Sequence, residues 1–368
     1  MKIFNRILNI LAFVSCLVLL YLFFPSVAQW IGSFKENGET KKLLIADHLD
    51  NLKSLKAVGS LVADKDVVKD FGNTGEQYEF DISYYPYYGM LNDNYKKLYK
   101  QIYANSLNMN DTFTPIIDIN KNDITLVMEA LLYDHPELFW LDNSYAYKYN
   151  TKGICLQLIL KFNNTSNDIE NNKRLFDREV NAILQESLNY DNLLEKEVFV
   201  HDRLVQNLNY DLSSDNNQSA YSALVNHYSV CAGYSKAFQY IMQKLGIPCY
   251  YVTGDSGGDH AWNIIKLDDY YYNVDLTWDN TGGNMYAYFN KNDKDFSLTH
   301  NRSAISANLP KCTGNSYVPV SKSKSTIKKS VDSTKDIQSI EKKNDDNYII
   351  EENKDTSKKD DSILGEAE

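Results

Sequence analysis

Two adjacent strand patterns joined by a short turn constrain the fold more than any other stretch of this 368-residue chain. Residues 260–267, HAWNIIKL, and 270–278, YYYNVDLTW, alternate in the manner of strands, and the Asp268–Asp269 pair between them predicts a tight hairpin turn. Residue numbers that face each other across this turn sum to about 537, because the turn sets the antiparallel register. His260 then lies opposite roughly residue 277, which allows the carboxylate of Asp275 to reach its imidazole.

A helical pattern upstream begins at a cysteine. Residues 231–247, CAGYSKAFQYIMQKLGI, place apolar side chains at helical spacing before a glycine that stops the helix: Phe238, Ile241, Met242, Leu245 and Gly246. Cys231 opens this helix, where backbone N–H groups and the helix dipole stabilise the negative, nucleophilic form of a thiol. Gly233 permits close approach of another segment. Alone, the cysteine is weak support for catalysis, because free cysteines are often simply buried.

The cysteine, the histidine and the acid together point to nucleophilic catalysis. A buried acid that holds one tautomer of a histidine, which in turn activates a thiol, is the logic of a catalytic triad. The candidate catalytic residues are therefore Cys231, His260 and Asp275. Trp262 and Trp278 flank the last two, and they either cover the triad or line an acyl subsite.

Three stretches resemble the core of the transglutaminase-like superfamily, which has a papain-like fold. They are NYDLSSDNNQSAYSALVNHYSVC, VCAGYSKAFQYIMQKLGIPCYYVTG and DHAWNIIKLDDYYYNVDLTWD, in the order of that family and within residues 195–290. The resemblance implies that Cys231 is the nucleophile, His260 the base and Asp275 the residue that orients it. Many relatives carry a glycine near the cysteine where this chain has NHYSVC, so only the backbone N–H of Cys231 is named as an oxyanion donor.

The function predicted from this resemblance is thiol acyl transfer on amide bonds of proteins or peptides, through an acyl-thioester. Water as the second substrate makes the enzyme a cysteine peptidase or amidase, and an amine makes it a transglutaminase. The alternative is a non-catalytic cell-surface module that binds peptide or wall polymer on the same fold. The segments ALLYDHPELFWL, YFNKNDKDFSLTHNRS and LPKC resemble those that accompany this core in secreted or membrane-anchored bacterial proteins.

Composition and cysteine spacing exclude several partners. The net charge is −11 and there is no long basic run, so a nucleic-acid partner is not expected. The five cysteines, at 16, 155, 231, 249 and 312, form no CxxC pair and no metal-ligand spacing, and we expect neither a metal nor a cofactor. Cys249 is expected in the core, with a Cys249–Cys312 disulfide as a minor alternative.

The N-terminus predicts a membrane anchor. Lys2 and Arg6 precede an apolar run at 7–24, long enough for an uncleaved transmembrane helix with the rest of the chain outside the cell membrane. The sequence SVA before Gln29 allows the alternative of a cleaved signal and a secreted protein.

The predicted organisation has four parts: a cytoplasmic stub and anchor at 1–31, an N-terminal α+β region at 32–190, a catalytic domain at 191–320, and a disordered charged tail at 321–368. Helices are expected at 41–58, 92–107, 123–135, 167–190, 193–208 and 231–245, and strands at 144–150, 154–162 and 248–254, besides the hairpin. The fold class is α+β, with the helix that carries Cys231 packed on an antiparallel sheet that carries His260 and Asp275. His135, His201 and His300 are predicted to be surface or packing residues.

Overall fold

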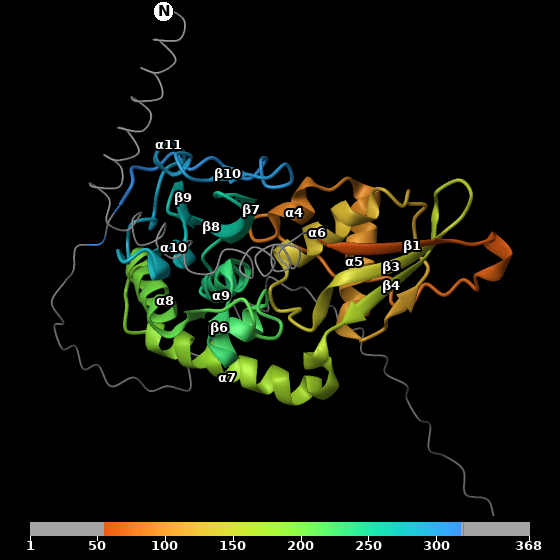
Figure 1. Cartoon of the computed structure of the whole chain (residues 1–368), viewed down its shortest axis with the longest axis horizontal. Helices are drawn as coiled ribbons and strands as arrows, with labels where there is room; N and C mark the ends of the chain where they lie inside the picture. Colours follow the sequence, from red (N-terminus) through yellow and green to blue (C-terminus); the bar gives the residue numbers. More distant parts are fainter. Residues whose placement is uncertain (1–54, 318, 320–368) are drawn as a thin grey trace, which may run out of the picture. The chain divides into compact units, whose positions relative to one another are not determined.

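The computed structural model describes residues 55–317 and residue 319 (Figure 1). The predicted anchor at 1–31 and the predicted charged tail at 321–368 lie outside the described residues, so both stay predictions. Within the described part, none of the helices has the length and apolar character that a membrane crossing requires.

The N-terminal part of the described chain is a four-stranded sheet with helices against it. Its strands run in the order β1-β3-β4-β2, with β1 parallel to β3 and the other pairs antiparallel. The elements are β1 Lys56–Leu61, a 3-10 turn Asp64–Asp66, α4 Pro86–Met90, α5 Asp93–Leu107, β2 Thr112–Phe113, α6 Ile124–Asp134, β3 Leu141–Tyr149, β4 Cys155–Phe162, a 3-10 turn Asn164–Asp168, and α7 Ile169–Ser187.

Local sequence signals account for most of these elements. The side chain of Asn92 accepts a hydrogen bond from the N–H of Tyr95 and so caps α5, whose buried face holds Leu98 and Ile102. Helix α6 ends before Pro136, as predicted, because the residue ahead of a proline disfavours helical geometry. The expected helix at 41–58 is wrong where it can be judged, because its last residues lie in β1. Pairing with β3 there overrides the helical pattern.

The C-terminal part carries the second sheet, in the order β10-β7-β8-β9 with every pair antiparallel. Helix α9 packs against β7 and β8, beside the teal strands of Figure 1, and the side-chain amide of Asn263 on β8 donates to the carbonyl of Ser235 on α9. The elements are α8 Leu193–Asn207, β5 Asn209–Tyr210, a π-helical turn Ser222–Asn226, β6 Tyr228–Ser229, α9 Cys231–Lys244, β7 Cys249–Asp255, β8 Asp259–Leu267, β9 Tyr270–Val274, α10 Leu276–Thr281, α11 Asp293–Phe296 and β10 Asn301–Arg302.

The hairpin has the predicted register. Asn263 pairs with Val274 and Leu267 pairs with Tyr270, around a two-residue turn in which Asp268 takes a φ of 49°. The second strand of the hairpin was predicted to run from residue 270 to residue 278, and its predicted end is wrong. Strand β9 ends at Val274, because the Asp275 side chain accepts backbone hydrogen bonds that start α10.

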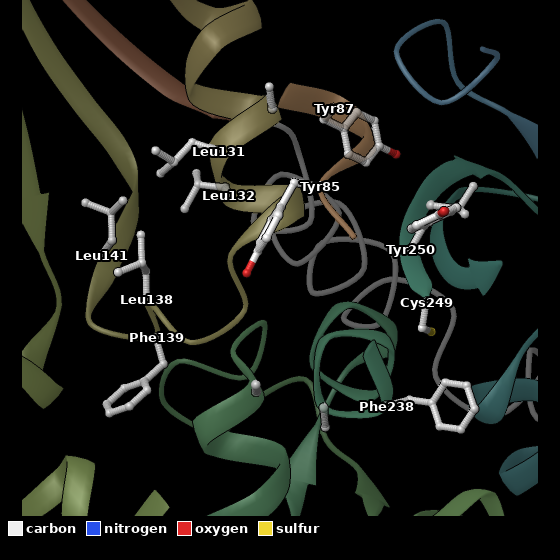
Figure 2. Close-up of a cluster of buried hydrophobic side chains, with 14 of the residues drawn as sticks. Tyr85, Tyr87, Leu131, Leu132, Leu138, Phe139, Leu141, Phe238, Cys249 and Tyr250 are labelled. Atoms are coloured by element: carbon white, nitrogen blue, oxygen red, sulfur yellow. The ribbon is translucent and has the colours of Figure 1, made fainter. Parts of the chain in front are cut away.

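One cluster of buried side chains runs through both parts of the described chain. Figure 2 shows Tyr85, Tyr87 and Leu131 from the region of α4 and α6 near Phe238 of α9 and Tyr250 of β7. Hydrogen bonds join the same elements: the hydroxyl of Tyr87 donates to the carbonyl of Tyr251 at 2.7 Å. The sheet that carries the hairpin is therefore supported from the N-terminal side, and the domain boundary predicted at 190 stays a prediction.

Candidate active site

Cys231 lies at the first position of α9, as the sequence predicts, and is 3% exposed. The two residues of β6 precede it in the chain. Val230, which lies between β6 and Cys231, adopts an extended conformation as the N-terminal cap of the helix. The N–H of Val230 donates to the carbonyl of Asn217 at 3.1 Å, which ties the approach to the preceding loop. The thiol thus sits at a helix N-terminus, where backbone N–H groups have no partner inside the helix.

Gly233 is required by close packing under the N-terminus of α9. A Cβ at this position would collide with the hydroxyl of Ser229 and with the carbonyl oxygens of Asn217 and Ser219. The close approach expected from the sequence is therefore present. It keeps the loop at 217–219 against the first turn of the helix and fixes the position of Cys231.

His260 is the second residue of β8, directly after a tight turn. The turn spans residues 256–258, in which Gly257 has a φ of 85° and the N–H of Ser256 donates to the carbonyl of Gly258. The imidazole Nε2 of His260 donates to Oδ2 of Asp275 at 2.7 Å. The other ring nitrogen is then free for Cys231, whose side chain forms a hydrogen bond with His260. The structure therefore brings together the three residues singled out from the sequence.

Asp275 is fully buried and accepts four hydrogen bonds. Its Oδ1 accepts from the backbone N–H groups of Thr277 at 2.9 Å and Trp278 at 3.1 Å. Its Oδ2 accepts from the imidazoles of His260 at 2.7 Å and His300 at 3.0 Å. Both oxygens are occupied by donors, so the carboxylate is held in one orientation.

The charges of His260 and Asp275 stabilise each other. Burial disfavours the imidazolium of His260, but the charge and hydrogen bond of Asp275, together with Cys231, outweigh it and raise the pKa of His260 to about 10. Burial likewise disfavours the carboxylate, yet His260 and His300 lower the pKa of Asp275 below its usual value. At neutral pH the site holds an imidazolium between the carboxylate of Asp275 and the sulfur of Cys231.

The raised pKa of His260 predicts a stability that depends on pH above neutrality. A folded-state pKa of about 10 exceeds the ordinary 6.5, so the stabilising contribution is complete below pH 6.5 and is lost as the pH rises towards 10. Between pH 7 and pH 9.5, we expect the free energy of unfolding of the wild type to fall by about 3 kcal/mol more than that of His260→Gln. Urea titrations of both proteins measure this, and equal falls would contradict it.

Aromatic side chains enclose the pair, as expected for Trp262 and Trp278. The ring of Trp262 stacks 6.2 Å from that of His260 and is 1% exposed, and the ring of Trp278 lies 5.9 Å away on another side. These rings exclude water from the bond between His260 and Asp275, which strengthens that bond.

His300 was predicted to be only a surface or packing residue, and this understates it. It packs, with no exposed side-chain surface, but it also contacts the same oxygen of Asp275 as His260 does. His135 and His201 were predicted to be surface or packing residues, and both are buried packing residues. His135 bonds to Glu137, and His201 bonds to Asp279 and so joins α8 to α10. No pattern in the sequence linked His300 to the site, because it follows Asp275 by 25 residues and a further helix.

Within residues 55–317, the group best placed to hold a metal ion consists of His260, Asp275 and His300. The ligand atoms of His260, Asp275 and His300 lie within 4.8 Å of one another. Both imidazoles, however, direct an N–H at Oδ2 of Asp275, so the nitrogens that a metal would need carry hydrogen. The three side chains form a hydrogen-bond network in this structure.

Two further polar side chains, one on β5 and one on α9, had no signal in the sequence. Tyr210 on β5 pairs with Ser229, just ahead of Cys231. Burial raises the pKa of the Tyr210 phenol and the charges of Cys231 and Asp275 raise it further, so the hydroxyl stays a hydrogen-bond donor. Lys236 on α9 is 9% exposed, and burial lowers its pKa to about 8.

The four cysteines of the described chain are all unpaired thiols, so no disulfide joins Cys249 to Cys312. Cys249 lies in the core, as predicted. Burial raises the pKa of the thiols of Cys155, to about 12, and of Cys249 and Cys312. These three thiols are therefore poor nucleophiles at neutral pH.

Comparisons with known proteins agree with the site. Residues 182–276 match the profile of the Transglutaminase-like superfamily, a segment that contains Cys231, His260 and Asp275. The segment at 182–276 is therefore transglutaminase-like. No curated protein matches the chain.

Two solved structures share a distant likeness with the chain. One is the crystal structure of a TGase, with 15% identity, a TM-score of 0.26, and coverage of 45% of this chain and 50% of that one. The other is a candidate cysteine protease from Cytophaga hutchinsonii, with 22% identity, a TM-score of 0.26, and coverage of 28% of this chain and 37% of that one. The chain thus spans half or less of each structure, and at these scores neither likeness bears on its activity.

Proposed function

We propose that this protein is a thiol acyl-transfer enzyme that acts on amide bonds of proteins or peptides, with Cys231 as nucleophile. The observation that carries the proposal is the line of contacts from Cys231 through His260 to the fully buried Asp275. A structural histidine would not need a buried carboxylate with four donors and a thiol at a helix N-terminus on its other side.

The proposed first half-reaction uses the charges already in place. With its thiol proton on His260, the Cys231 sulfur attacks the carbonyl carbon of the amide as a thiolate, and the backbone N–H of Cys231 at the start of α9 donates to the oxygen that gains negative charge. The hydroxyl of Tyr210 is our candidate for a second donor. His260 then gives its proton to the departing amine, and an acyl-thioester on Cys231 remains.

The second half-reaction restores the site. His260, now neutral, takes a proton from the incoming water or amine, which attacks the thioester carbonyl, and the Cys231 sulfur leaves. Water gives a peptidase or amidase, and an amine gives a transglutaminase. Asp275 stays ionised throughout and holds the ring of His260 with Nε2 towards itself.

The acceptor is identified by two assays on the full-length chain in mild detergent. One follows incorporation of a fluorescent primary amine into a glutamine-rich protein, and the other follows hydrolysis of the same protein. Activity in either assay that disappears in Cys231→Ala supports the proposal and names the acceptor. Binding of the substrate protein without turnover, unchanged in Cys231→Ala, would support the non-catalytic binding module instead.

We further propose that the site works outside the cytoplasm, on a protein anchored by its N-terminus, with proteins or cell-wall peptides as substrates. The support is the apolar run at 7–24 after Lys2 and Arg6. Alkaline phosphatase fused after residue 60 is expected to be active, and a reporter that works only in the cytoplasm is expected to be inactive at the same junction. The reverse pattern would place the site in the cytoplasm. A membrane-bound product of full size would indicate a retained anchor, and a shorter product released from the membrane would indicate a cleaved signal.

A further inference from the structure

A second imidazole, that of His300, binds the carboxylate of Asp275. His300 follows α11, and its backbone N–H donates to the carbonyl of Phe296 at 3.1 Å. Its Nε2 lies 3.0 Å from Oδ2 of Asp275, the same oxygen that accepts from His260. The superfamily match ends at residue 276, so this contact comes from a segment that the match does not include.

Aromatic side chains surround the ring of His300. The ring of Phe296 stacks against it with centres 3.9 Å apart, and the rings of Trp278 and Trp262 lie at 4.7 Å and 5.1 Å. The side chain has no solvent exposure. A buried polar ring among aromatic side chains is costly unless its nitrogens are satisfied, and here both are.

The hydrogen-bond partners of His300 decide where its protons lie. The carboxylate of Asp275, whose pKa is lowered, can only accept, so the Nε2 of His300 carries hydrogen and donates. The other nitrogen, Nδ1, is 2.8 Å from the hydroxyl of Thr299. In the neutral ring this hydroxyl donates to Nδ1, and it thereby fixes the tautomer that donates to Asp275.

We propose that His300 is a positioning residue of the active site, which donates to the oxygen of Asp275 that also binds His260, and so fixes the carboxylate and shares its charge. The inference rests on the proposed function, because it concerns how readily His260 gives up a proton. A carboxylate that binds one imidazolium alone would hold that charge more tightly. With a second donor on the same oxygen, His260 can protonate a departing amine more easily.

The test follows the protonation of His260 without any turnover. Full-length chain with Cys231→Ala is labelled with ¹³C at the rings of its six histidines, and the resonance of His260 is assigned by its loss in His260→Gln. The ring signal is then followed by NMR from pH 6 to pH 11. Tyr210, Tyr288, Asp279 and the thiol of Cys231 are the other titratable groups that act on His260 and Asp275, and the alanine removes the last of them.

A matched pair of variants separates the donor from the ring. His300→Phe keeps an aromatic ring among the surrounding aromatic side chains but removes the hydrogen-bond donor to Asp275. It is expected to raise the titration midpoint of His260 by about half a pH unit. His300→Gln restores an N–H near the position of Nε2 and is expected to bring the midpoint back to that of the parent. An unchanged midpoint in His300→Phe, or an equal shift in both variants, would overturn the inference.

A second variant decides the question if His300→Phe does not fold. Thr299→Val removes the hydroxyl on Nδ1, so it weakens the donor on Nε2 and should move the midpoint upwards by a smaller amount. Thr281→Val is the control, because its hydroxyl bonds only to the carbonyl of Thr277 within α10. No difference between these two threonine variants would also overturn the inference.

The same variants in the chain with Cys231 intact separate this inference from the proposed function. His300→Phe is expected to lower kcat with little change in KM, and to move the pH dependence of kcat to higher pH. If the wild type transfers no acyl group to any acceptor, the proposed function fails, while the titration still decides what His300 does to His260.

Discussion

Replacing Cys231 by alanine is expected to lower turnover by roughly 10⁶-fold, the loss seen when the nucleophile of a triad is removed. The sulfur is the only atom at this site to which the acyl group is transferred in the proposed reaction. The substitution removes one small atom from the first turn of α9 and leaves Gly233 and the packing beneath it intact, so the thermal midpoint should stay close to that of the wild type. Initial rates with either acceptor measure the effect.

Alkylation of the thiols provides the control for this prediction. Iodoacetamide at neutral pH should modify Cys231 before Cys155, Cys249 and Cys312, whose thiols have pKa values raised by burial. His260→Ala should slow the modification of Cys231, because the imidazolium no longer stabilises its thiolate. Peptide mapping separates the four sites from Cys16. Equal rates at all four, with no effect of His260→Ala, would mean that the site is structural.

Asp275→Asn is the second large effect, with an expected loss in turnover of about 10⁴-fold if the triad of serine hydrolases is a fair guide. The amide keeps the shape of the side chain but has only one accepting oxygen. It cannot accept from the two backbone N–H groups of α10 and also from both imidazoles. His260 then adopts the wrong tautomer or turns away from Cys231. The quantity to measure is kcat at saturating substrate.

Asp279→Asn is the matched control, four residues further along the same stretch. Asp279 is also buried and also bonds to a buried histidine, His201, at 3.1 Å, but neither residue contacts His260. We expect this variant to lose stability, as substitutions in buried hydrogen-bond networks do, and to keep turnover within about tenfold of the wild type. Similar losses in turnover for the two variants would mean that Asp275 acts only through the fold.

The sequence predicted the central geometry of the site because that geometry is local. A two-residue turn at 268–269 sets the register of β8 and β9, and the register alone brings His260 close to Asp275. Cys231 was identified as the candidate nucleophile because a helical pattern begins at that residue and stops at Gly246, and both ends of this pattern can be seen in the sequence. The contact between the helix and the sheet followed from the family resemblance and is present.

Two element predictions failed because hydrogen bonds outweighed the pattern of apolar residues. The residues at 56–58 look helical but form β1, because β3 offers them a strand to pair with. Asp275 looks like part of a strand, but its side chain is drawn into capping α10 while it binds two histidines. In both cases the deciding hydrogen bonds come from partners that a periodicity cannot reveal.

The sequence by itself determined the helix that begins at Cys231 and the hairpin register that brings His260 close to Asp275. Each depends on spacing, turn residues and apolar periodicity over a few residues. Only the tertiary structure decided that Asp275 is fully buried with four donors, and that His300 is one of them. The reason is that α11 and the turn after it return to the sheet from 25 residues away, and the pairing is made by the packing of Phe296 and the two tryptophans around the ring.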